Sequence, residues 1–473
     1  MKGSFSVPTL LLTLALPVTG TRARGAEDPP RRPNVVFVYT DDQARWSLGA
    51  YGNRDVKTPN FDRLAREGAL FRNAFTVTPV CSPSRAGMFT SRYPTRLGID
   101  DWIEPGKEPG LGLDSSALLW PELLRGAGYS TMLLGKWHLG TLDRFHPTLQ
   151  GYDRFFGFRA GGNTPLNPKL EVEGTVRQLQ GSLPDLLVDQ GLKSIEANRA
   201  RPFLLSVHFR EPHAPYSPTP EEDAAVYRDL DPRIPDVPGL PRERAKQLTR
   251  EYYASVHSVD RNVGRLLDAL DRWNLAGGTI VIATSDHGYM IGHHGLWHKG
   301  NGVWLVQGKT GPRPNMFDDA IRVPFLVRWP GVVKPGTIIE RVVSNLDLFP
   351  SVLEMTGVGM PPNLKVDGRS FAPLLSGLPT APPWDDTLFG QYDMHHSKVA
   401  RMRLIRTPEW KLIRHFEPDG MDELYHLATD PDETTNRINY PQQRERLKVL
   451  KTLLHGRMTA VGDPLSDSSN LDH

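Results

Sequence analysis

The sequence predicts an α/β fold, in which helices cover a large mixed, mostly parallel sheet and a smaller C-terminal α+β domain follows. Several apolar runs rich in β-branched residues show little alternation, as expected for strands covered on both faces. Helical patterns separate these runs, and strands that alternate with helices indicate a largely parallel sheet. The change of sequence texture after about residue 360 indicates the smaller domain.

The predicted elements follow from these patterns in chain order. The buried strands are NVVFVYT (34–40), STMLLGK (130–136), PFLLSVHF (202–209), GTIVIATS (278–285) and VPFLVRWP (323–330). A proline start and a Glu-Gly end mark a helix in TPNFDRLAREGALF. A second helix, ASVHSVDRNVGRLLDALDRW, has an apolar side formed by Val256, Val259, Val263, Leu266, Leu267 and Leu270.

Three regions are expected along the chain. Residues 1–26 have the layout of a secretory signal peptide, with Lys2 followed by an apolar run and small residues. A catalytic domain is expected over 33–376. GLPTAPPWDD then reads as a linker, and a smaller domain over 383–463 contains a hairpin (KVARMRLIRTPEWKLIRHF) and a helix (PQQRERLKVLKTLLHGRM). The tail GDPLSDSSNLDH is expected to be disordered.

Composition and hydropathy limit the possible partners. The formal net charge is only +2, which does not favour a nucleic-acid binder. The apolar run near the N-terminus is too short to span a bilayer, so an exported protein (periplasmic, secreted or cell-surface) without a stable membrane span is expected. A retained N-terminal anchor is the alternative.

Polar side chains follow the predicted strands at the points where they end. Asp41 and Asp42 follow the first strand, and Asp286 and His287 follow GTIVIATS. The other two strand ends lead to the basic residues Lys136, His138 and His213. In open α/β sheets, ligand sites form at the carboxyl ends of the strands, so these side chains are expected to converge.

The residue types at these strand ends indicate the chemistry of the site. Clustered carboxylates bind a hard cation such as Ca²⁺ or Mg²⁺, and nearby lysines and histidines suggest an anionic ligand. HHGLWHK (293–299) adds His294, His298 and Lys299. Its His-x₃-His spacing allows a zinc interpretation, but no Glu general base accompanies it and the glycines disfavour a stable helix.

Cys81 is the only cysteine of the chain and therefore cannot form an internal disulfide. A free cysteine is often a small buried hydrophobe. CSPSRAGMFTS, however, is expected to open a helix, because Pro83 suits the first turn, where free amides favour anions. Arg85 lies on the same face one turn later. This is the position expected of a nucleophile.

These segments resemble the type I, formylglycine-dependent sulfatases of the alkaline phosphatase superfamily. CSPSRAGMFTSRYPTRLGI is similar to their motif Cys-x-Pro-Ser-Arg and the stretch after it. PNVVFVYTDDQ, GKWHLG, PHAPY and SDHGYMIGHHGLWHKG resemble further family blocks in the family's order, and the resemblance extends from about residue 33 to about 440. It implies the family's fold and the hydrolysis of sulfate esters.

The resemblance also implies an unusual nucleophile. A maturation enzyme would oxidise Cys81 to formylglycine (3-oxoalanine), with Ser82, Pro83 and Ser84 as part of its recognition motif. One hydroxyl of the hydrated aldehyde would attack sulfur and expel the alcohol, and deprotonation of the other would release sulfate and restore the aldehyde. A thiolate would instead leave a covalent S-sulfate with no easy exit.

Roles for the remaining residues follow from the same resemblance. One calcium ion, favoured over magnesium, would be bound by Asp41, Asp42, Asp286, His287 and the modified residue 81. His287 could instead contact the sulfate or support the ligands.

The same resemblance places catalytic and substrate-binding groups around the nucleophile. Arg85 would hold the hydrated aldehyde, while Lys136 and Lys299 would bind the sulfate. His138 would be the base, and His213 would bind sulfate and protonate the leaving alcohol.

Three alternatives remain open at this point. A phosphonate monoester or phosphodiester hydrolase shares the fold and is the runner-up. A non-catalytic binder of sulfated glycans would have no need for His138 and Arg85 together. A thiol hydrolase would leave the aspartates without a role.

The expected substrate is a sulfated carbohydrate or an aryl sulfate. Trp297 and His298 are the candidate substrate contacts beside Lys299. Further aromatic and polar residues in predicted loops could line the pocket: Trp102, Arg159, Asn163, Arg210, Trp304, His395 and His396.

Overall fold

The computed structural model describes residues 1–5, 32–377 and 382–466. The chain divides into two units, Met1–Arg31 and Arg32–His473, and the second contains the described helices and strands. Most of the predicted signal peptide, part of the predicted linker and most of the predicted tail fall outside the described residues. Among the described helices, none combines the length and the apolar character needed to cross a membrane.

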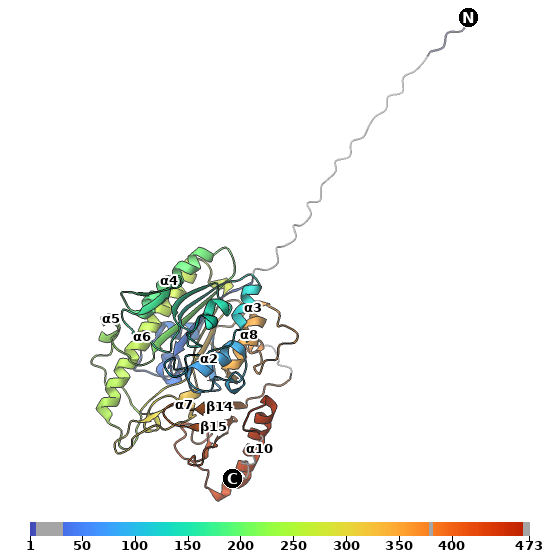
Figure 1. Ribbon diagram of the computed structural model, residues 1–473. Coiled ribbons are helices and arrows are strands. Elements are labelled where there is room, and N and C mark those ends of the chain that lie inside the picture. The colour runs from blue at the N-terminus through green and yellow to red at the C-terminus, as the bar shows by residue number, and fades with distance from the viewer. Residues whose placement is uncertain (6–31, 378–381, 467–473) are drawn as a thin grey trace. The chain divides into compact units, whose positions relative to one another are not determined.

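A large mixed sheet forms the centre of the second unit (Figure 1). Within the described ranges its strands lie in the order β13 (Thr337–Ser344), β2 (Ala69–Phe75), β12 (Phe325–Arg328), β8 (Thr279–Ser285), β1 (Asn34–Asp41), β7 (Phe203–Pro212), β3 (Ser130–Lys136), β4 (Arg154–Phe158), β5 (Lys169–Val172) and β6 (Thr175–Gln178). The strands from β8 to β4 are parallel to one another, which confirms the predicted class.

Helices cover both faces of this sheet, as Figure 1 shows. One face packs against α1 (Pro59–Glu67), α4 (Leu183–Asn198) and α6 (Arg242–Arg272), with α5 (Glu221–Ala225) alongside α6. The other face packs against α2 (Cys81–Thr90), α3 (Trp120–Gly126), α8 (Leu348–Thr356) and α9 (Ala372–Ser376). Residues of β1 alternate between the two cores, because successive side chains of a strand point to opposite faces.

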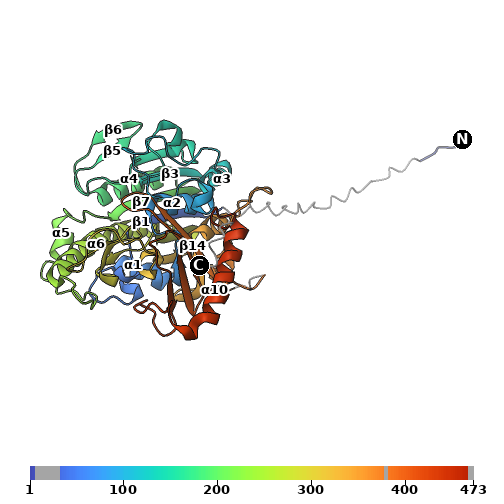
Figure 2. The same cartoon turned by 60° about the horizontal axis from the view of Figure 1, so that its bottom comes forward.

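The C-terminal part is a smaller antiparallel sheet with one long helix. Its strands are β14 (Leu388–Met394), β15 (Ala400–Arg406), β16 (Trp410–His415) and β17 (Glu423–His426), and the helix is α10 (Arg444–Val461). Figure 2 shows α10 running alongside this sheet. The hairpin of β15 and β16 and the final helix confirm the prediction, while the boundaries of the two domains remain predictions.

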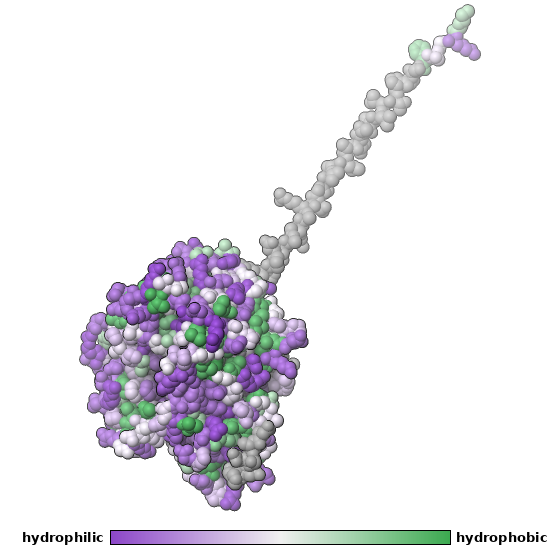
Figure 3. Space-filling model, in the orientation of Figure 1, coloured by the Kyte–Doolittle hydropathy of each residue, from purple (hydrophilic) through white to green (hydrophobic). Residues whose placement is uncertain are grey.

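Two smaller features complete the described fold. A short sheet consists of β9 (Met290–Ile291), β10 (Leu296–His298) and β11 (Val303–Trp304), and α7 (Asp318–Ile321) precedes β12. Trp297, His298 and Trp304 therefore lie on short strands and not in loops, which corrects that part of the prediction. On the face shown in Figure 3, apolar residues are scattered among polar ones.

Candidate active site

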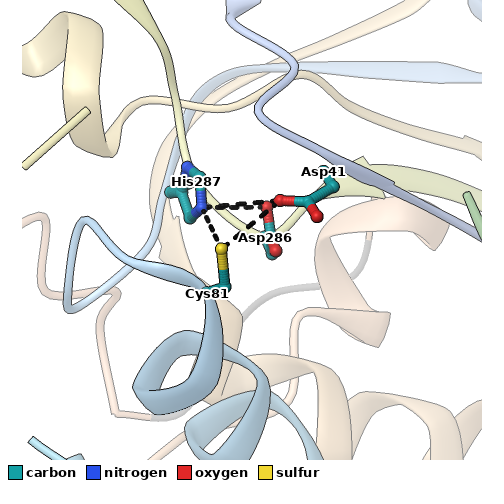
Figure 4. A group of neighbouring side chains, drawn as sticks. All are labelled: Asp41, Cys81, Asp286 and His287. Atoms are coloured by element: carbon teal, nitrogen blue, oxygen red, sulfur yellow. Dashed lines mark hydrogen bonds and ion pairs between the residues drawn. The ribbon is translucent and has the colours of Figure 1, made fainter. Parts of the chain in front are cut away.

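The nucleophile candidate Cys81 is the first residue of α2, which begins as predicted. The residue is 2% exposed. The sulfur lies 3.1 Å from Lys299 Nζ, 3.3 Å from His287 Nε2 and 3.5 Å from Asp41 Oδ1. Figure 4 shows the sulfur pointing from the helix start toward Asp41, Asp286 and His287.

Three carboxylates come from the ends of two neighbouring parallel strands. Asp41 ends β1, Asp42 follows it, and Asp286 directly follows β8, so the parallel pairing of β1 with β8 brings them together. All three side chains are buried. Ligand atoms of Asp41, Cys81, Asp286 and His287 lie within 4.8 Å of one another.

Positive side chains surround the carboxylates. Lys136, the last residue of β3, pairs with Asp41, and Lys299 Nζ lies 2.7 Å from Asp42 Oδ1. Arg85 donates from Nε to Asp286 Oδ2 at 3.0 Å, and its guanidinium lies over the ring of Tyr39. The predicted convergence of these residues is therefore present.

The donor set fits a hard divalent cation. Burial raises the pKa of Asp42 to about 7, and burial together with the charge of Asp41 raises the pKa of Asp286. Asp42 Oδ2 is buried and has no hydrogen-bond partner among the described residues. A bound cation would relieve the repulsion between these carboxylates, and carboxylate oxygens are the ligands that Ca²⁺ and Mg²⁺ prefer.

The local field also acts on Cys81 and His287. Burial and Asp41 oppose ionisation of the Cys81 thiol, but Lys136, Lys299 and His287 outweigh them and lower its pKa to about 6. Burial opposes the charged form of His287, yet Asp286 raises the pKa of this imidazole to about 9. The site therefore favours negative charge at residue 81.

His138 and His213 approach the centre from two loops. His138 lies two residues beyond β3, and its Nε2 donates to the Ile103 carbonyl at 3.0 Å, while its Nδ1 is buried without a hydrogen-bond partner among the described residues. His213 follows β7, and its side chain is 27% exposed. Its Nε2 lies 3.7 Å from Asp42 Oδ2.

The candidate substrate contacts lie at different places in the fold. Trp297 and His298 stack at 4.3 Å on the strand that leads to Lys299. His395 and His396 each contact Glu108, and the ring of His396 lies 4.4 Å from that of Trp102. Trp102 directly precedes Ile103, whose carbonyl accepts the hydrogen bond from His138. His395 and His396 therefore lie near the segment that contacts His138.

Other residues of this candidate group make contacts within the protein that the sequence did not indicate. Arg159 pairs with Asp143 and Glu171, Asn163 Nδ2 donates to the Lys169 carbonyl, and Lys309 lies over the Trp304 ring. The prediction placed Arg210 in a loop, whereas it lies on β7 and is 1% exposed. Its strand continues to Pro212, past the predicted end at 209, because β7 stays paired with β1 up to Asp41.

Residues that support the site were missed by the sequence analysis. Tyr39 lies beneath Arg85, and Asn345 Nδ2 donates to the Ser84 carbonyl at 3.0 Å. Tyr39 could have been found from strand alternation, since it lies two residues before Asp41. Asn345 is distant in sequence and carries no local signal.

Comparisons with known proteins find similar sequences over most of the chain. The family model described as Sulfatase matches residues 33–358, and the model described as N-sulphoglucosamine sulphohydrolase, C-terminal, matches residues 313–460. A steryl-sulfatase from Rattus norvegicus is 32% identical over 425 residues, which cover 74% of this chain and 72% of that protein. An N-acetylglucosamine-6-O-sulfatase from Bacteroides thetaiotaomicron is 26% identical, covering 94% of this chain and 90% of that protein.

A solved structure extends the likeness to the fold. It is described as a complex with the substrate D-glucosamine-2-N,6-O-disulfate, and it superposes with a TM-score of 0.80 at 24% sequence identity. The match covers 93% of this chain and 100% of that chain. At this identity, the likeness concerns the fold alone.

Proposed function

The chain belongs to the sulfatase family and is a sulfuric ester hydrolase, and from that premise we propose that it desulfates a sulfated carbohydrate. The proposed nucleophile is a hydrated formylglycine made from Cys81. The observation that carries this proposal is the position of Cys81 at the start of α2, in contact with Lys299, His287 and Asp41.

A calcium ion is the metal we propose for the site. Asp41, Asp42 and Asp286 would hold it, together with residue 81 and His287. When bound, the ion would withdraw electron density from a sulfate oxygen and favour ionisation of the nucleophilic hydroxyl. The orphaned oxygen of Asp42 supports this assignment.

The modified residue would supply covalent catalysis, with one hydroxyl to attack sulfur and a second to release sulfate afterwards. Arg85 is held against Asp286 and would keep the hydrated residue oriented from within α2. His138 has an Nδ1 without a partner among the described residues, and we assign it the removal of the proton from the second hydroxyl.

Two lysines and one histidine would act on the sulfate ester itself. Lys136 and Lys299 lie in contact with the carboxylates and would neutralise the sulfate oxygens. Of the two proposed catalytic histidines, His213 is the more exposed. Its side chain is 27% exposed, whereas His138 is buried, with 4% of the residue exposed. We assign His213 to sulfate binding and to protonation of the departing alcohol. Because Nδ1 donates to the Ala214 carbonyl, the form that gives a proton from Nε2 is the imidazolium, which becomes the neutral ring as the alcohol leaves.

A carbohydrate is the substrate class that the relatives favour. The relative that matches the larger share of this chain is an N-acetylglucosamine-6-O-sulfatase, whereas the steryl-sulfatase matches a smaller share. Trp297 and His298 would contact the sugar, because partly exposed aromatic rings provide apolar faces with polar edges. The signal peptide proposed over residues 1–26 would export the enzyme after the maturation enzyme has acted.

Mass spectrometry of the peptide that contains residue 81 tests the proposal. The protein is produced with a formylglycine-generating enzyme and assayed for sulfate release from a panel of sulfated sugars. We expect the aldehyde mass and sulfate release, and Cys81→Ala should release none. An intact thiol with full activity would contradict the nucleophile, and cleavage of phosphonate esters alone would favour the runner-up.

A further inference from the structure

Arg210 and Glu211 form a buried charged pair that the proposed mechanism does not use. Both lie near the end of β7, each is 1% exposed, and Arg210 Nη1 lies 3.5 Å from Glu211 Oε1. Among the described residues, Arg210 Nε and Nη1 and both Glu211 carboxylate oxygens have no hydrogen-bond partner. A buried pair with so few hydrogen bonds seldom adds to stability, so stability alone does not explain it.

The turn after β7 is attached to Arg210 at two points. The Arg210 guanidinium donates from Nη2 to the Pro215 carbonyl at 2.8 Å, and the His213 amide donates to the Arg210 carbonyl at 3.0 Å. Both ends of the turn that carries His213 are therefore held by one residue.

The orientation of the His213 ring follows from this turn. His213 Nδ1 donates to the neighbouring Ala214 carbonyl at 2.6 Å, since a carbonyl can only accept. The ring is then left with Nε2 directed to the centre, 3.7 Å from Asp42 Oδ2. Ala214 lies between His213 and the Pro215 carbonyl, so a shift of Pro215 would also shift the acceptor that orients the ring.

We propose that Arg210 is a positioning residue, which fixes the His213 ring toward the sulfate ester by clamping the turn from within β7. The inference rests on the proposed function, because it takes His213 to act on the substrate. An arginine suits this place, since its planar fork can reach the Pro215 carbonyl and Glu211 at the same time.

A double-mutant cycle between Arg210→Met and His213→Ala tests the inference on a sulfated sugar. Misplacement of a reacting group by about 1 Å can cost about 100-fold in rate, so Arg210→Met should lower kcat by roughly 10- to 100-fold. KM should rise as well, because His213 is also assigned to sulfate binding. In the His213→Ala background, the same change should alter kcat by less than about 2-fold, because coupled residues are not additive.

Two controls and one substitute variant complete the experiment. Arg210→Lys can still donate to Pro215 and should restore part of kcat. Arg403→Met removes another buried arginine, one on β15 that pairs with Asp393 and Asp463, and its effect should be the same in both backgrounds. If Arg210→Met fails to fold, Arg210→Met/Glu211→Gln, which removes both charges, takes its place in the cycle.

Equal losses in both backgrounds would overturn the inference, because Arg210 would then only support the fold. A separate comparison tests the role of His213 itself. His213→Ala should slow a sugar sulfate far more than 4-nitrophenyl sulfate, whose leaving group needs no proton. Equal slowing of both would refute the acid role of His213, while the cycle would still decide the role of Arg210.

Discussion

Individual charges around Cys81 are buried and contact one another. Lys299 contacts both Asp42 and Cys81, and Arg85 is fully buried against Asp286. Removing one partner of such a pair leaves the other charge buried and uncompensated, which costs more than the pair itself contributes. Substitutions at this scale should therefore affect both activity and the local electrostatics.

Lys299→Met is expected to lower kcat by about 100-fold or more, as does loss of one group that stabilises developing charge in other hydrolases. The lysine Nζ lies 3.1 Å from residue 81, so its charge acts where the sulfate would react. Sulfate release and far-ultraviolet circular dichroism measure activity and fold. Lys309→Met, an exposed lysine over Trp304, is the matched control, and equal turnover by both variants would contradict the role.

Glu423→Gln is expected to reduce stability in a pH-dependent way. Burial would raise the pKa of Glu423, but a hydrogen bond from His415 and the charge of Arg313 lower it from 4.5 to about 2. Because its pKa is lower in the folded state, Glu423 adds about 3 kcal/mol to the free energy of unfolding at neutral pH. This contribution is fully present above pH about 4.5 and is lost as the pH falls through about 2.

Urea unfolding of the wild type and of Glu423→Gln at pH 7 and pH 3.5 measures this contribution. The difference in the free energy of unfolding between wild type and Glu423→Gln should be about 1 kcal/mol smaller at pH 3.5 than at pH 7. Glu409→Gln, on the exposed turn between β15 and β16, is the control. A difference that stays constant, or grows on acidification, would refute the assignment.

At the scale of elements, the sequence predicts the central strands well and the peripheral ones poorly. β1, β3, β7 and β8 are covered on both faces and therefore read as continuous apolar runs. β13 contains exposed Glu340 and Arg341 at the sheet edge, so its sequence lacks that pattern. In TPNFDRLAREGALF, the helix ends at Glu67, at the predicted Glu-Gly end, and the residues after Gly68 belong to β2, a strand that the sequence did not indicate.

The site follows the same logic. Residues directly after a central strand could be predicted, because the chain fixes their position within one or two residues. The contact of Asn345 with Ser84 joins segments that are distant in sequence, so no local pattern predicts it. The contact of Arg210 with Pro215 depends on the conformation of a turn, which no local pattern specifies either.

Gly135→Ala is expected to weaken the pairing of β3 with β7. Gly135 has φ +96°, and a Cβ there would lie 2.0 Å from the His208 carbonyl oxygen. The left-handed conformation alone costs roughly 1–2 kcal/mol in other residues, and the clash adds to it. A loss of more than about 2 kcal/mol in the free energy of unfolding is therefore expected.

Urea unfolding measures this loss, and sulfate release reports on Lys136, the next residue. Gly162→Ala is the control, since a Cβ there meets nothing within 4 Å, and its effect should stay within about 0.5 kcal/mol. If both variants had the same free energy of unfolding, the contact between Gly135 and the His208 carbonyl would not be what requires a glycine at this position.

At the scale of the whole molecule, the described part of Arg32–His473 forms one compact unit. One hydrophobic cluster contains Phe75 and Val80 from the catalytic part together with Met402 and Ile413 from the C-terminal sheet. The two parts share a core, so a ligand that stabilises the active site should stabilise the molecule as a whole.

Removal of calcium is expected to lower both activity and the melting temperature. A ligand that binds only the folded state adds about 2.7 kcal/mol at a concentration of about 100 Kd, and the repelling carboxylates give the folded state that preference. Differential scanning fluorimetry and sulfate release after chelation, with calcium, magnesium or zinc added back, measure the effect. Recovery with zinc alone would contradict the calcium assignment.

The burial of α2 places a time limit on the proposed maturation. Every residue from Cys81 to Thr90 is buried, so an oxidising enzyme has no access to the motif once the chain has folded. Oxidation and folding would then be two competing rates, and a chain that folds first would be excluded from activity permanently. The specific activity of a preparation would report this competition, and conditions that slow folding during synthesis would increase it.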